Sequence, residues 1–261
     1  MSYNCLNFQI KGGTHLNEKI NTANDTSNQS LKMIKRGITV GFPIMLGYLP
    51  IAITYGVLAK QSGLSLFELT MMSVLVFAGA SQFMGANMIA VGSGAIEIII
   101  ATFVLNFRHF VMSLSFMNRL RAMGPKWRAF LSLGLTDETF AVSALHTDEA
   151  NEKKGALFYL SLFLTAYLSW VAGSLLGGLL GEVIPEKLSQ SMGIALYAMF
   201  IGLLVPSVKK ELKVGLIAII AMLTHVCCSY ILNMSSGWSI VFGTIIGGFS
   251  GVFLLERDEE A

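Results

Sequence analysis

The sequence predicts an all-α integral membrane protein with about six to seven transmembrane helices, one or two of them broken or re-entrant. Hydrophobic residues make up 54% of the chain, charged residues only 13%, and the mean hydropathy is +0.64. An ordinary soluble domain carries about 25% charged residues. The apolar stretches also lack the alternation of a membrane β-barrel, and helices satisfy their own backbone hydrogen bonds in lipid.

Seven apolar stretches approach or exceed the ~17–25 residues that a spanning helix needs. They lie at about 37–59, 67–91, 95–118, 156–181, 190–206, 214–232 and 237–255. Together they predict a membrane domain over residues 32–255. Residues 1–31 are polar and cannot bury enough apolar surface to fold alone, so we expect a disordered tail. Residues 256–261 are expected to form an acidic C-terminal tail.

Basic clusters flank the apolar stretches at 32–36, 119–128, 153–154 and 209–213. The positive-inside rule places all of them, and with them the C-terminus, in the cytoplasm. Three full crossings between Arg36 and Arg119 contradict this, unless the N-terminus is outside or one segment enters and leaves on the same side. We favour the second alternative for 67–91, because small and polar residues at 77–83 interrupt it.

Residues 129–145 form a shorter apolar segment that carries the adjacent carboxylates Asp137 and Glu138. We expect it to be a second re-entrant or cavity-lining element. The alternative is an interfacial helix on the cytoplasmic side with Asp137 as its N-cap, a position that Asp often takes.

The stretch at 95–118 carries Asn106, Arg108 and His109 near its middle. A charge at this depth costs several kcal/mol, roughly 2.5–3.5 on insertion scales, unless it faces a partner or a water-filled cavity. This cluster is therefore the first candidate for function.

Four motifs follow one another along the chain: Gly63-Leu64-Ser65, VFAGASQF at 76–83, NFRH at 106–109 and LTDETFA at 135–141. In this order and spacing they resemble the AzlC family of bacterial membrane proteins. The resemblance covers roughly Lys35–Leu255. It implies a multi-pass protein of the bacterial inner (cytoplasmic) membrane that exports branched-chain or related apolar amino acids. It also implies a small AzlD-like membrane subunit as partner.

A zwitterionic amino acid needs hydrogen-bond donors for its carboxylate, acceptors for its ammonium group and an apolar pocket for its side chain. Backbone N–H groups near Gly79 and Ser81, together with Gln82, are candidate donors, since helix N-termini bind anions. Asn106 is a candidate for the ammonium group. Arg108 either holds the carboxylate, neutralises Asp137, or extends toward the membrane edge.

Ion or proton coupling is assigned to His109, Asp137 and Glu138. His109 is the one of these that titrates near neutral pH, although it could equally be hydrogen-bonded between helices. Asp137 and Glu138 could bind the ammonium group or transfer protons.

Other functions fit the sequence less well. An uptake permease or a channel is the nearer alternative, and an intramembrane serine hydrolase using Ser81 and His109 is a distant one. The sequence contains no GxSxG elbow, HExxH pair or phosphate-binding loop. We therefore expect no enzyme activity, no cofactor, no metal and no nucleic-acid partner.

Two glycine stripes and one acidic residue complete the expectations. The stripes repeat every four residues, at Gly173, Gly177 and Gly181 and at Gly243, Gly247 and Gly251. Such stripes let helices approach closely, either inside the chain or, for the last helix, between subunits. Glu97 is expected to be solvated at the outer membrane edge.

Overall fold

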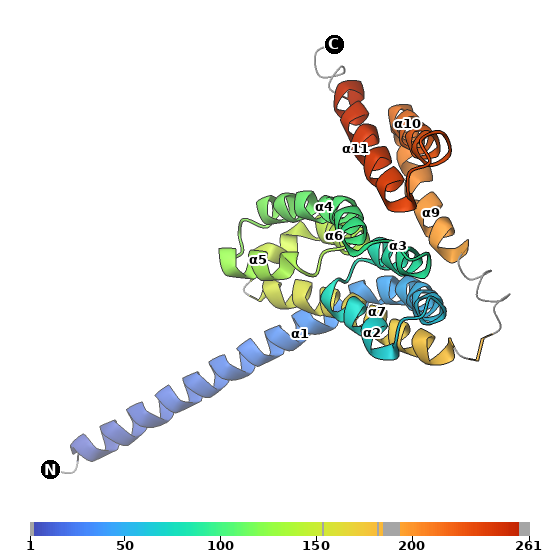
Figure 1. Ribbon diagram of the computed structural model, residues 1–261. Coiled ribbons are helices and arrows are strands. Elements are labelled where there is room, and N and C mark those ends of the chain that lie inside the picture. The colour runs from blue at the N-terminus through green and yellow to red at the C-terminus, as the bar shows by residue number, and fades with distance from the viewer. Residues whose placement is uncertain (1–2, 153, 182, 185–193, 256–261) are drawn as a thin grey trace. The chain divides into compact units, whose positions relative to one another are not determined.

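The computed structural model describes residues 3–152, 154–181, 183–184 and 194–255. Its α-helices, shown in chain order in Figure 1, are α1 (Tyr3–Gln61), α2 (Leu66–Leu75), α3 (Gly79–Ala90), α4 (Ala95–Arg119), α5 (Pro125–Ser132), α6 (Asp137–Leu145), α7 (Gly155–Leu180), α9 (Ile194–Lys210), α10 (Leu212–Val226) and α11 (Ser236–Leu255). A 3₁₀ turn at Thr147–Asn151 precedes α7, and a π-helical turn at Cys227–Ile231 continues α10. The described residues contain no strand, which confirms the all-α class.

Five helices in the described part of the chain are long and apolar enough to cross a membrane. They are Ser27–Gln61, Ala95–Arg119, Gly155–Leu180, Leu212–Ile231 and Gly237–Leu254. The expected number was six to seven. The difference arises because α9 has 17 residues and because the stretch at 67–91 is broken into two short helices. The chain is a multi-pass helical membrane protein.

Both ends of the chain were expected to be tails. The helix α1 includes most of the N-terminal residues for which the sequence predicts disorder, and its candidate span begins only at Ser27. The disorder of 1–31 stays a prediction. The acidic C-terminal tail at 256–261 lies outside the described residues.

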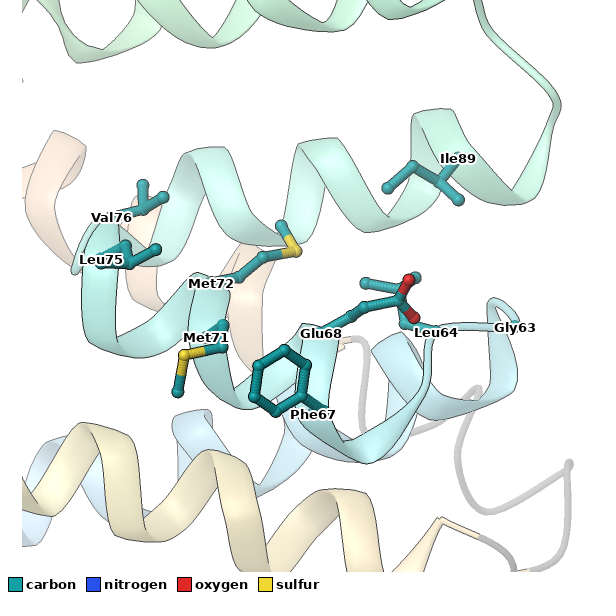
Figure 2. Close-up of a pocket in the computed structure, with 9 residues that line it drawn as sticks. All are labelled: Gly63, Leu64, Phe67, Glu68, Met71, Met72, Leu75, Val76 and Ile89. Carbon is teal, nitrogen blue, oxygen red and sulfur yellow. The ribbon is translucent and has the colours of Figure 1, made fainter.

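The helices α2 and α3 form an antiparallel hairpin. Gln82 near the start of α3 donates to Ser73 near the end of α2, whereas Ile89 at the end of α3 lies across from Glu68 at the start of α2 (Figure 2). The two helices have 10 and 12 residues. At 1.5 Å per residue each reaches about 15–18 Å, roughly half of a ~30 Å hydrocarbon core. The predicted break in this stretch is confirmed, and the chain returns toward its starting level.

Local sequence fixes the start of α2, and contacts with α7 stabilise its end. Ser65 caps its start, accepting from the Glu68 amide while Glu68 Oε2 accepts from the Ser65 amide at 2.7 Å, which is a capping box. At the other end the backbone of Phe77 turns through φ = 44°, a region that a bulky residue rarely adopts. The buried Phe77 ring packs edge-on against Tyr167, with centroids 5.0 Å apart. The Tyr167 hydroxyl donates to the Val74 carbonyl at 2.9 Å, so α7 stabilises the break.

The segment at 129–145 divides at residues 133–136 into the end of α5 and the start of α6. Thr136, not Asp137, is the N-cap of α6, and it forms a reciprocal pair with Thr139. Asp137 and Glu138 occupy the first turn, where a carboxylate is favoured by the helix dipole. The N-cap alternative for Asp137 is therefore wrong by one residue, and a re-entrant position in the membrane stays a prediction.

The chain divides into two compact units. The first unit consists of residues 1–44 and 115–166. In it, α1 approaches α7 so closely that a Cβ on Gly37 would lie 2.3 Å from the Phe158 carbonyl oxygen. Arg36 pairs with the buried Glu149 at 2.5 Å.

The second unit consists of residues 45–114 and 167–261, and its glycine stripes pack inside the chain. A Cβ on Gly177 would lie 2.1 Å from the Ile53 carbonyl oxygen of α1, and one on Gly247 would lie 2.6 Å from Ala221 Cβ of α10. Internal packing is thus confirmed for both stripes, including the last helix, for which a subunit contact was the alternative.

Glu97 is not simply solvated at the membrane edge, as the sequence suggested. Its Oε1 accepts from the Gly237 amide at 2.9 Å and from the Ser235 hydroxyl. These groups belong to the start of α11, where a carboxylate is favoured by the unsatisfied amides of the first turn. Glu97 therefore ties the first turn of α4 to α11.

Candidate functional site

A cavity of about 430 Å³ lies in the second unit, between the α2–α3 hairpin and α4. Its size falls within the ~300–1,000 Å³ of typical ligand pockets. Polar groups come from Ser81, Gln82, Thr102 and Asn106. Most of the remaining lining is apolar, with Met72, Val76 and Ile89 from the hairpin and Ile98, Ile99 and Phe103 from α4. We call this cavity the Asn106 pocket.

Ser81 and Asn106 join the hairpin to α4. The Ser81 hydroxyl lies 2.8 Å from Asn106 Oδ1 and 3.0 Å from the Ala78 carbonyl oxygen, and can donate its proton to one of them at a time. Ser81 is buried whereas Asn106 is half-buried. The pair therefore places the Asn106 amide at the polar end of the cavity.

Gln82 is fully buried and hydrogen-bonded at both ends of its amide. Its Oε1 accepts from Trp170 Nε1 at 2.8 Å, and its Nε2 donates to Ser73 Oγ at 2.8 Å. The Ser73 hydroxyl donates to Ser174 Oγ at 2.7 Å, and Ser174 donates to the Trp170 carbonyl. This network, which we call the Gln82 network, closes on itself between α2, α3 and α7. Because a buried polar group without a partner is costly, it fixes the hairpin in one position.

Aromatic rings enclose the Gln82 network on the side of α1. Tyr48 lies edge-on to Trp170 at 5.6 Å, Tyr55 stacks on it at 6.3 Å, and Tyr55 lies edge-on to Phe83 at 5.6 Å. The indole also leaves no room for a side chain at Gly79, where a Cβ would lie 2.7 Å from Trp170 Cη2. Glycine at 79 thus allows the start of α3 to contact the tryptophan.

The first turn of α3 provides backbone donors beside the Asn106 pocket. Its N-cap residue Ala78 forms no side-chain cap, so the opening amides are not satisfied by a capping hydroxyl or carboxylate. Ser81 in the same turn lines the cavity. A helix start of this kind is suited to an anionic group such as a carboxylate.

Of the predicted substrate-binding residues, Ser81, Gln82 and Asn106 line the pocket, whereas Gly79 lies against Trp170. Their role in binding a substrate stays a prediction. Arg108 and His109 follow Asn106 on α4, are half-buried, and are not among the residues that line the pocket.

Asp137 and Glu138 belong to the first unit, where both are half-buried. The pairing of Asp137 with Arg108 and the coupling roles of His109, Asp137 and Glu138 stay predictions.

Sequence reasoning missed Ser73, Trp170, Ser174 and Thr102. Buried Trp N–H groups need an acceptor, so Trp170 in an apolar stretch was a signal for a polar partner. Ser174 lies four residues further along α7 and Thr102 four residues before Asn106, which places each pair on one helix face. No sequence rule joins Gln82 to Trp170, because 88 residues separate them.

The model of the AzlC protein family matches residues 43–184, which is more than half of the chain. The chain belongs to the AzlC family. The matched region includes every residue that lines the Asn106 pocket and every predicted site residue. In this AzlC-family chain, α9, α10 and α11 lie beyond the match.

Relatives extend over most of the chain. An uncharacterized membrane protein of Archaeoglobus fulgidus is 36% identical over 179 residues, 68% of this chain and 77% of the relative. The branched-chain amino acid transport protein AzlC of Bacillus subtilis is 28% identical over 204 residues, 78% and 79% of the two chains. The inner membrane protein YgaZ of Escherichia coli is 26% identical over 179 residues, 67% and 73%. No solved structure gives a significant match.

Proposed function

We propose that this AzlC-family chain is the transport subunit of an exporter for branched-chain or related apolar amino acids. The observation that carries the proposal is the Asn106 pocket, which joins a polar end to apolar walls. Similarity to a Bacillus subtilis protein named as a branched-chain amino acid transport protein supports the substrate class.

The pocket offers complementary groups to a zwitterion. The opening amides of α3 receive the substrate carboxylate, because a helix start favours an anion. Asn106 Oδ1 accepts from the ammonium group, exchanging its hydrogen bond with Ser81 for one with the ligand. The aliphatic side chain lies against Ile98, Ile99 and Phe103.

Direction, coupling and partner complete the proposal. Export is coupled to an ion or to protons through His109, Asp137 and Glu138. A small AzlD-like membrane subunit assembles with the chain. The chain resides in the bacterial cytoplasmic membrane with its C-terminus in the cytoplasm, as the positive-inside rule predicts from the basic clusters of the sequence.

The test is efflux of preloaded radiolabelled leucine or valine from cells that express the chain with its small partner. Cells with the chain should lose label faster than cells without it. Asn106→Ala should lower the efflux rate at least tenfold. Asn118→Ala is the matched control, because Asn118 lies on the same helix, is exposed, and contacts Arg121 instead of the pocket. Unchanged efflux of every apolar amino acid would refute the proposal.

Ser81→Ala separates transport from the hydrolase alternative. Removing the hydroxyl takes one hydrogen bond from Asn106, so substantial export should remain. A hydrolase with Ser81 as nucleophile would lose all activity.

A further inference from the structure

A second cavity of about 480 Å³ lies along α2, on the side that Figure 2 shows. Gly63, Leu64, Phe67 and Glu68 line one end of it, and Leu75 lines the other. We call it the Glu68 pocket. Its exposed apolar side chains include Phe67 and Leu75.

The Glu68 pocket and the Asn106 pocket share three lining residues, Met72, Val76 and Ile89. Met72 and Val76 come from α2 and its C-cap, and Ile89 from the last turn of α3. These three side chains therefore lie where the two pockets adjoin, with Met72 half-buried and with Val76 and Ile89 exposed. The boundary is entirely apolar, and the Glu68 carboxylate and the Asn106 amide lie beyond it on opposite sides.

Met72 is the most adaptable part of this boundary. Its sulfur lies 3.5 Å from the Tyr55 hydroxyl, a weak contact. Its terminal methyl lies against Gly85, where a Cβ would be 3.6 Å away. Methionine has three rotatable side-chain bonds, and the absence of a side chain at Gly85 leaves room beside it. A change of rotamer at Met72 alters the boundary without moving either helix.

Glu68 gives the second pocket a charge. Figure 2 shows its carboxylate directed toward the side of Leu64 and Ile89. The Ser65 hydroxyl and the Ser65 amide both donate to Glu68 Oε2 at 2.7 Å. Hydrogen bonds of this kind favour the ionised form of a carboxyl group. An anionic group above apolar walls suits a ligand with an ammonium group and an apolar side chain.

We propose that Met72, Val76 and Ile89 form an apolar gate between the two pockets. An apolar amino acid passes this gate and occupies the Glu68 pocket with its ammonium group at Glu68. The identity of the ligand rests on the proposed function, whereas the gate rests on the shared boundary. Because the substrate must pass this gate, the side chain at position 72 determines both the transport rate and the largest substrate side chain that can pass.

The gate is tested by labelling a cysteine in the Asn106 pocket. Thr102→Cys is introduced into the full chain with Cys5, Cys227 and Cys228 replaced by serine, and the protein is reconstituted in vesicles. A charged, water-soluble thiol reagent reaches the new thiol at position 102 only through water-filled space, because the bilayer excludes it. Met72→Trp should slow labelling at least tenfold, and Met72→Ala should accelerate it severalfold.

Met222→Trp is the matched control. Met222 lies on α10, is exposed and lines neither pocket. The thiol at position 102 should therefore be labelled as fast in Met222→Trp as in the parent protein, which keeps Met72 and Met222. Equal rates in Met72→Trp, Met72→Ala and the parent would overturn the gate, as would equal slowing by Met222→Trp. If Met72→Trp does not insert into the membrane, Met72→Ala and Met72→Val still test whether a smaller side chain at position 72 accelerates labelling.

The Glu68 contribution is tested separately with Glu68→Gln. Glutamine can keep the capping box at Ser65 while removing the charge. In leucine transport by the chain with its partner, the KM should rise at least fivefold while labelling of the thiol at position 102 stays unchanged. An unchanged KM would overturn the role of Glu68. Labelling of the thiol at position 102 requires no transport. If the chain transports no amino acid, the proposed function is refuted, and the labelling rates alone decide whether the gate exists.

Discussion

The α2–α3 hairpin and the α10–α11 pair hold two helices together by different means. Across α2 and α3, Gln82 and Ser73 form a buried hydrogen bond that extends to Trp170 of α7. Across α10 and α11, Gly243 and Gly247 bring the backbones together against Ala221. The α2–α3 pair is held by polar side chains, whereas the α10–α11 pair packs closely because its glycines have no side chains.

The difference follows from helix length and function. A helix long enough to span lipid satisfies its own backbone, so close packing is sufficient to hold a partner. In the hairpin, α2 ends and α3 starts beside the buried residues Phe77 and Ala78, where open helix termini need partners from other elements. Those same open ends and polar groups line the Asn106 pocket. A hairpin that must be held by hydrogen bonds is thus also the place where a polar ligand can bind.

The largest effect is expected from breaking the Gln82 network. Gln82→Met keeps the length of the side chain but leaves Trp170 Nε1 without its acceptor, while Ser73 Oγ loses the bond from Gln82 and keeps the one to Ser174. Each buried unsatisfied group costs about 1–3 kcal/mol, so we expect loss of leucine efflux and a clearly lower melting temperature in detergent. Thr70→Val is the control, because the Thr70 hydroxyl bonds only within α2, to Leu66. A wild-type melting temperature for Gln82→Met would show that the network does not hold the hairpin.

A smaller but clear effect is expected at the start of α3. Gly79→Ala places a methyl 2.7 Å from Trp170, and the rings around that indole prevent it from moving away. Overpacking of this kind costs typically ~1–3 kcal/mol. Gly85→Ala on the same helix would meet only the flexible end of Met72, at 3.6 Å. The level of inserted protein should fall for Gly79→Ala and not for Gly85→Ala, and equal levels would contradict the close approach to Trp170.

The glycine-packed pair offers the matching test. Gly247→Leu forces α11 away from α10, since even a Cβ at this position would lie 2.6 Å from Ala221 Cβ. At Gly248, one residue on, a Cβ would meet nothing within 4 Å, so Gly248→Leu is the control. We expect Gly247→Leu to lower the melting temperature and Gly248→Leu to leave it unchanged. Because this pair lies outside the pocket, export per inserted molecule should fall less than in Gln82→Met. The comparison would fail if both leucine variants behaved alike.

The smallest effect is expected at Glu97, which joins α4 to α11. Glu97→Leu removes the acceptor for the Gly237 amide and the Ser235 hydroxyl, at about 1 kcal/mol for a typical hydrogen bond. Glu97→Gln retains an acceptor and should behave nearly as the wild type. Melting temperatures of the two variants measure the difference. Equal values would mean that the bond contributes nothing to holding α11.

The site was predictable as far as local sequence reaches. The small and polar residues at 77–83 indicated a break, and the structure ends α2 and starts α3 there. Ser81 and Asn106 were singled out as polar groups in apolar stretches, and the structure places them in contact at one pocket. The cap of α6 was missed by one residue. Apolar composition does not reveal where a helix ends, and Thr and Asp are comparable as caps.

Sequence by itself determined that the chain is a helical membrane protein, where its apolar segments lie, and which of them is interrupted. These features depend on composition and on neighbours within a few residues, which the chain carries whatever its fold. Only the tertiary structure decided that Gln82 is bonded to Trp170 and Ser73, that Ser81 contacts Asn106, and that Met72 lines two pockets. Such contacts join distant segments, and they depend on how helices pack, which no local pattern encodes.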